Sequence, residues 1–130
     1  MVLDTSAVIA LLFEENDAPQ LRSLLFATPL RKIGAPTLVE AGMVMGGRNV
    51  VGYPAFLDGF VENMELDVLP FTRDHAVVAR AAFDRFGKGR HPAALNFGDC
   101  MSYAVAKIEN EPLLFKGNDF AQTDILAAAY

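Results

Sequence analysis

The chain has 130 residues, of which 52% are hydrophobic, enough for one domain with a single core over residues 1–130. No segment reaches the ~18 uncharged apolar residues of a membrane span, and early acidic residues argue against a secretory signal. One cysteine excludes an intrachain disulfide and favours a cytoplasmic protein. The net charge of −5 argues against simple electrostatic binding of nucleic acid, although bound metal ions can reverse the local sign.

The hydrophobic pattern predicts short strands separated by helices. Asp17 and Asn96 are expected to cap helices, and Thr37 with Glu40 matches a capping box. A tail over 125–129 adds an edge strand or packs on the core. The expected helices cover 6–13, 17–28, 37–45, 53–64, 72–86 and a segment from 96 onward, and the expected strands cover 30–35, 66–69 and 113–115. This order indicates an α/β fold with a mostly parallel sheet covered on both faces.

Four acidic residues, Asp4, Glu40, Asp99 and Asp119, each end or follow an apolar run. The carboxyl ends of parallel strands gather at one edge of a sheet, where ligands bind. Carboxylates meeting there would repel one another unless a divalent cation held them, and Mg²⁺ or Mn²⁺ suits phosphate chemistry. Each acid alone also has a structural explanation, as a helix cap, a first-turn anion or a turn residue.

Three stretches carry a resemblance to a known family: VLDTSAVIALL, FGKGRHPAALNFGDCMSYAVAK and LLFKGNDFAQTDI. With them the chain resembles PIN-domain proteins, in particular the VapC-type toxins of type II toxin–antitoxin systems, over essentially its full length. The resemblance implies a three-layer α/β/α sandwich and a metal-dependent endoribonuclease that uses Mg²⁺ or Mn²⁺. It also implies an RNA substrate, a cognate antitoxin and a homodimer.

Carried over onto this sequence, the resemblance makes Asp4, Asp99 and Asp119 the metal-binding acids, and Glu40 completes the catalytic set. Asn118 stands where many relatives carry a further acid, which leaves Asp119 the sole strong ligand in its turn. Asp124 is either an outer ligand or a turn residue.

Residues that could contact substrate are less strongly indicated. Ser6 and Ser102 lie close in sequence to two of the acids, where hydroxyls could act behind the metal ligands. A basic segment supplies further candidates, with a solvated loop as the alternative: Arg85, Lys88 and Arg90. We expect His75 on the exposed side of its helix and Cys100 as a small buried residue.

Two other functions stay open on the sequence. The chain could transfer phosphoryl groups through an aspartyl-phosphate, with Asp4 as nucleophile and Lys116 as countercharge, although a phosphatase would have a second Asp where Ser6 stands. It could also be a non-catalytic module that binds a protein partner.

Overall fold

A sheet of four short parallel strands lies at the centre of the computed structural model, which describes residues 1–130. Its strand order is β3-β2-β1-β4, so the first strand of the chain lies inside the sheet. Parallel neighbours need crossover connections, and helices provide them. The strands are β1 (Val2–Leu3), β2 (Lys32–Gly34), β3 (Asp67–Leu69) and β4 (Leu113–Leu114).

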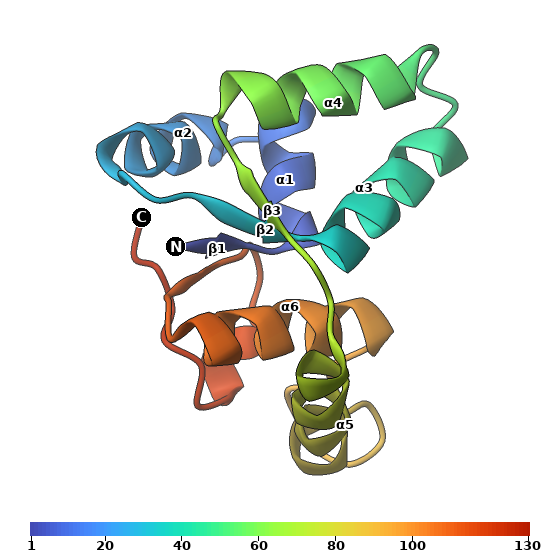
Figure 1. Ribbon diagram of the computed structural model, residues 1–130, viewed down its shortest axis with the longest axis vertical. Coiled ribbons are helices and arrows are strands. Elements are labelled where there is room, and N and C mark those ends of the chain that lie inside the picture. The colour runs from blue at the N-terminus through green and yellow to red at the C-terminus, as the bar shows by residue number, and fades with distance from the viewer.

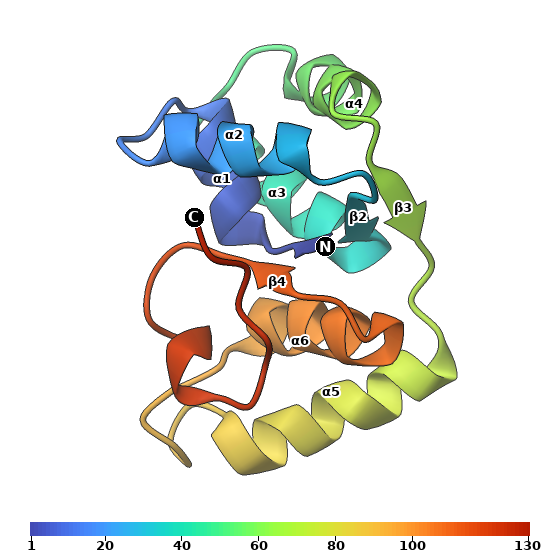
Figure 2. The ribbon, with the colours of Figure 1, turned by 90° about the vertical axis from the view of Figure 1, so that its left-hand side faces the viewer.

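Helices cover both faces of this sheet (Figure 1). The helices α1 to α4 lie on one face, and α5 and α6 lie on the other, as the turned view also shows (Figure 2). None of the helices is long and apolar enough to cross a bilayer. The helices are α1 (Thr5–Leu12), α2 (Ala18–Ala27), α3 (Ala35–Gly47), α4 (Tyr53–Asn63), α5 (Arg73–Phe86) and α6 (Phe97–Glu109), with a short 3₁₀ turn at Phe120–Gln122.

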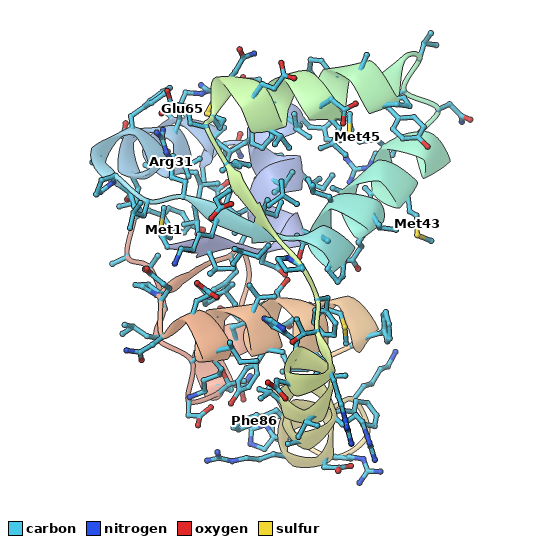
Figure 3. The ribbon with its side chains drawn as sticks, in the orientation of Figure 1. Met1, Arg31, Met43, Met45, Glu65 and Phe86 are labelled. Atoms are coloured by element: carbon cyan, nitrogen blue, oxygen red, sulfur yellow. The ribbon has the colours of Figure 1, made fainter.

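The core is divided by the sheet into two hydrophobic clusters. Side chains alternate between the faces of a strand, so Val2 packs with α5 and α6 whereas Leu3 packs with α1 to α4. Helix periodicity sorts α3 in the same way: Met45 is fully buried, whereas Met43 is 71% exposed and points away from the helix bundle (Figure 3). The predicted three-layer α/β/α fold is confirmed.

Three local predictions need correction. Helix α3 begins at Ala35, with Gly34 as N-cap, so Thr37 and Glu40 form no capping box. Pro36 in the first turn, where its missing N–H costs nothing, explains the early start. His75 is buried, not exposed, because its Nδ1 accepts hydrogen bonds from the N–H and hydroxyl of Thr72 in the capping box of α5.

The chain end makes less sheet structure than an added strand. Ala127 forms a single parallel bridge with Leu113, through hydrogen bonds from Leu113 N to Leu126 O and from Ala128 N to Leu113 O. The tail therefore packs beside β4 without forming a strand.

Candidate active site

The topology brings the four predicted acids to the carboxyl edge of the sheet. Asp4 directly follows β1, Asp119 follows β4 after a short turn, and Glu40 lies on the helix that follows β2. Asp99 lies in the first turn of α6. The negative charges of the other three acids all raise the pKa of Asp99, so the four carboxylates share one electrostatic environment.

Asp4 is held in place by its own helix. It is the N-cap of α1, and its Oδ2 accepts hydrogen bonds from the Ser6 N–H at 2.9 Å and the Ser6 hydroxyl at 2.6 Å. The same Ser6 hydroxyl accepts a hydrogen bond from the Lys116 N–H at 2.9 Å. Ser6 therefore orients Asp4 and joins it to the end of β4. Asp4 is only 4% exposed, which makes its carboxylate costly to leave without a cation.

Asp99 is fixed by a capping box. Asn96 Oδ1 accepts a hydrogen bond from the Asp99 N–H at 2.9 Å, and Asp99 Oδ2 accepts one from the Asn96 N–H at 2.8 Å. This confirms Asn96 as the cap of α6. Burial, followed by the charges of Asp4, Asp119 and Glu40, raises the pKa of Asp99 to about 6, against the bond from Asn96, which lowers it. No positive side chain is among the causes, so none offsets the negative charges around Asp99.

Glu40 reaches the site from α3. Its Oε2 accepts a hydrogen bond of 2.5 Å from the Thr5 hydroxyl, and its carboxylate lies against the Cα of Gly98. Neither Thr5 nor Gly98 was among the predicted site residues. Their positions next to Asp4 and Asp99 in the sequence were the available signal, but a threonine and a glycine at helix starts are too common to stand out.

The donor set suits a hard divalent cation. Each of Asp4, Glu40 and Asp99 uses one carboxylate oxygen in these hydrogen bonds and keeps the other free, and Asp119 forms no side-chain hydrogen bond. No lysine, arginine or histidine forms an ion pair with any of the four. As the side chains stand, no three of them enclose a metal position. Free carboxylate oxygens without a cationic partner are ligands of the kind that Mg²⁺ and Mn²⁺ prefer.

The two predicted serines differ in access. Ser6 is partly exposed and acts on Asp4, as described. Ser102 is fully buried and shares a hydrogen bond of 3.2 Å with the Thr37 hydroxyl, between α6 and α3. A substrate cannot reach it, so Ser102 contributes to packing and the expectation of substrate contact is corrected.

The basic candidates lie at the end of α5 and in the loop before α6, and all three are exposed. Arg85 forms an ion pair with Asp124 at 3.1 Å, and Arg90 approaches Asp84 at 3.9 Å, whereas Lys88 forms no ion pair. Asp124 also accepts a 2.6 Å hydrogen bond from Tyr103, which is the main cause of its lowered pKa. Asp124 is therefore a structural residue and not an outer ligand.

The structure argues against catalytic roles for Cys100 and Lys116. Cys100 is buried, and burial together with the charge of Asp99 raises its pKa to about 11, so it is an inert thiol as predicted. The Lys116 ammonium binds Glu15 at 2.6 Å and Asp17 at 2.8 Å. It is thus not free to act as the countercharge of an aspartyl-phosphate at Asp4.

A groove begins at the acidic site and continues along α6. Its first part, of about 530 Å³, has Glu40 and Gly98 in its wall. Pro36, Phe97 and Met101 also line a second hollow of about 780 Å³, in which Arg80 and Arg90 are the basic residues. Phe97 is 80% exposed at this junction. A mostly apolar hollow that contains Arg80, Asp84 and Arg90 therefore adjoins the hollow that contains Glu40.

The fold and this acidic edge define an α/β protein with a four-carboxylate site at the carboxyl edge of a parallel sheet. The family model for the PIN domain matches residues 1–126, so the chain belongs to the PIN-domain family. This confirms the resemblance seen in the sequence.

Characterised relatives and solved structures agree with this membership. Ribonuclease VapC28 of Mycobacterium tuberculosis is 43% identical over 98% of this chain and 97% of its own length. The crystal structure of M. tuberculosis VapC20, a sarcin-ricin loop cleaving toxin, superimposes with a TM-score of 0.80 at 17% identity, over 99% of this chain and 98% of that one. VapBC2 of Rickettsia felis, bound to a DNA fragment from its promoter, gives a TM-score of 0.74 at 18% identity, over 97% and 94%.

Proposed function

We propose that this protein is an endoribonuclease toxin that hydrolyses phosphodiester bonds in RNA with the help of Mg²⁺ or Mn²⁺. The observation that carries the proposal is the set of four carboxylates without a cationic partner at the carboxyl edge of the sheet. The ribonuclease names of relatives about 43% identical along nearly the whole chain support RNA as the substrate.

Asp4, Asp99 and Asp119 would hold the metal ion, each with an oxygen that forms no side-chain hydrogen bond. When bound, a divalent cation offsets the negative charge of a phosphodiester and lowers the pKa of water. Ser6 keeps Asp4 in one orientation, and Asn96 does the same for Asp99. Glu40 Oε1, which forms no hydrogen bond, would accept a proton from the attacking water as the new bond to phosphorus forms and the bond to the leaving ribose oxygen breaks. The leaving oxygen would take a proton from the solvent.

The groove beside Glu40 would receive the RNA strand. Arg90, one of the predicted contacts, lies with Arg80 in its second part, where both can bind phosphates. Arg85 is engaged by Asp124, which leaves Lys88 and Arg90 as the better candidates from the basic segment.

A cognate antitoxin would neutralise the toxin, as the toxin–antitoxin complexes among the structural neighbours suggest by analogy. We further propose a single domain over residues 1–130 that acts in the cytoplasm as a homodimer. Exposed apolar side chains such as Val39, Met43 and Phe56 offer surface for protein contacts.

The test is cleavage of total cellular RNA by the partner-free protein with Mn²⁺ or Mg²⁺, with the Asp99→Asn variant as control. Asparagine keeps the carbonyl that accepts from the Asn96 N–H but removes the charge. We expect discrete fragments from the wild type and none from the variant. Equal cleavage by both would remove Asp99 from the mechanism, and cleavage by neither, with metal present and both proteins folded, would favour a binding module.

A further inference from the structure

Of the three acids of the site whose carboxylates accept hydrogen bonds, Glu40 is the one that its own helix does not hold. Asp4 is bound by Ser6 two residues away, and Asp99 by Asn96 three residues away. Glu40 lies in the second turn of α3, and its only hydrogen bond comes from Thr5, which is distant in sequence. Its position in the site therefore depends on other elements.

Two residues form the seat of Glu40. The Thr5 hydroxyl, on a side chain that is 8% exposed in the first turn of α1, donates to Glu40 Oε2 at 2.5 Å. On the other side, a Cβ placed on Gly98 would collide with both oxygens and the carboxyl carbon of Glu40. Only a residue without a side chain lets the carboxylate lie this close to the start of α6.

Thr5 and Gly98 hold the negative charge of Glu40 close to the negative charges of the other acids in the site. The Glu40 carboxylate lies against Gly98, the residue next to Asp99, so it lies close to a second carboxylate that repels it. Glu40 is only partly buried, and without the Thr5 hydroxyl its flexible side chain could move toward solvent. A charge-assisted hydrogen bond opposes this movement.

We propose that Thr5 and Gly98 are positioning residues, which fix Glu40 in the active site and act on RNA cleavage through it. This inference rests on the proposed function. It also places the seat on the immediate neighbours of Asp4 and Asp99, so α1 and α6 set the place of the acid that α3 supplies.

The first test is a cycle of Thr5→Val and Glu40→Ala with RNA cleavage as readout. Valine keeps the shape of threonine but has no hydroxyl. Loss of a group that orients a site residue typically costs 10–100-fold, so we expect Thr5→Val to lower kcat by about 10–100-fold with little change in KM. Thr5→Ser, which keeps the hydroxyl, should stay close to wild type. In the Glu40→Ala background Thr5→Val should have no further effect.

The second test needs no activity. We expect Mn²⁺, titrated calorimetrically, to bind Thr5→Val and Glu40→Ala more weakly than wild type and the double variant no more weakly than Glu40→Ala. Gly98→Ala should also weaken Mn²⁺ binding by the wild type, because the colliding carboxylate must move, and should cause no further weakening in the Glu40→Ala variant.

The outcomes separate this inference from the proposed function. Wild-type activity in Thr5→Val, or equal losses with and without Glu40, would overturn the positioning role while leaving the nuclease intact. If even the wild type cleaves no RNA, the proposed function fails, and the Mn²⁺-binding cycles still decide the role: overlapping effects support it and additive effects refute it. The Tm of each variant in EDTA verifies that it is folded.

Discussion

Charged side chains are paired at one edge of the sheet, whereas carboxylates lack cationic partners at the other. At the amino edge, Lys32 binds Glu109 at 2.8 Å and Glu111 at 3.4 Å, and Glu111 also binds the amino group of Met1 at 2.7 Å. The ion pair between Arg31 and Glu65 lies at the same edge (Figure 3). At the carboxyl edge, four carboxylates share one site without a cationic side chain. Charges are paired within the protein at the first edge and have no cationic partner at the second.

The largest expected difference between the edges is in activity. Asp4→Asn should reduce RNA cleavage by more than about 100-fold, because it removes one of the proposed metal ligands while asparagine still caps α1. Its matched control is Glu111→Gln, which removes one charge from the amino edge and should leave cleavage within about twofold of wild type. Initial rates at saturating Mn²⁺ measure both variants. A large loss of activity in Glu111→Gln would contradict the assignment of cleavage to the carboxyl edge alone.

Metal addition should act on the carboxyl edge alone. A cation that binds only the folded state stabilises it by about 2.7 kcal/mol at a concentration of 100 Kd. We therefore expect Mn²⁺ to raise the Tm of the wild type and of Glu111→Gln, and EDTA to reverse the rise. Asp4→Asn should lose most of it. An equal rise in Asp4→Asn would place the ion at another site.

A substitution at the amino edge should instead lower the free energy of unfolding. Lys32→Met keeps an apolar stem of similar length but leaves Glu109 without its partner, on side chains that are only 17% and 26% exposed. We expect a loss of about 1–2 kcal/mol in the free energy of unfolding, measured by urea denaturation, with RNA cleavage unchanged. A loss of cleavage without a loss of stability would contradict this assignment.

Features that depend on the local sequence were predictable, whereas those that depend on contacts between distant residues were not. The helices, three of the four strands and the four acids were predictable, because apolar periodicity marks the elements and each acid ends or follows an apolar run. The two-residue strand β1 was not predicted, because so short a run shows no periodicity, and the resemblance to PIN-domain proteins gave the four acids their roles. Periodicity could not show the seat of Glu40, since Thr5 and Gly98 meet it only across three helices.

Other misses have the same physical origin. His75 was predicted at the surface because polar residues on helices usually lie there, and Ser102 was predicted near the substrate because it lies close in sequence to Asp99. Ser102 is instead buried because Thr37 on another helix shares a hydrogen bond with it, and His75 because it completes the cap of α5. The ion pairs of Lys32 join residues 77 and 79 positions apart, which no local pattern reveals.

The smallest expected difference concerns pH. Burial, together with the other acids, raises the pKa of Asp99 from 3.8 to about 6, so the folded state binds a proton more tightly than the unfolded state between these values. In EDTA, lowering the pH from 7 to 5 should therefore increase the free energy of unfolding. At the amino edge, the hydrogen bond from the Met1 amino group is the main cause of the lowered pKa of Glu111. Its stabilisation is present above its ordinary pKa of 4.5 and is lost as the pH falls through the lower folded value.

The metal-free protein should thus be most stable near pH 5, with each side of the maximum set by a different edge of the sheet. Urea denaturation between pH 3 and 8 tests this, with effects on the order of 1 kcal/mol. Asp99→Asn should flatten the rise from pH 7 to 5 and keep the loss below 4.5, whereas Glu111→Gln should keep the rise and reduce the loss. If either substitution altered the stability changes on both sides of the pH maximum equally, the two edges would be coupled. Their charges could then not be assigned separately to function and to stability.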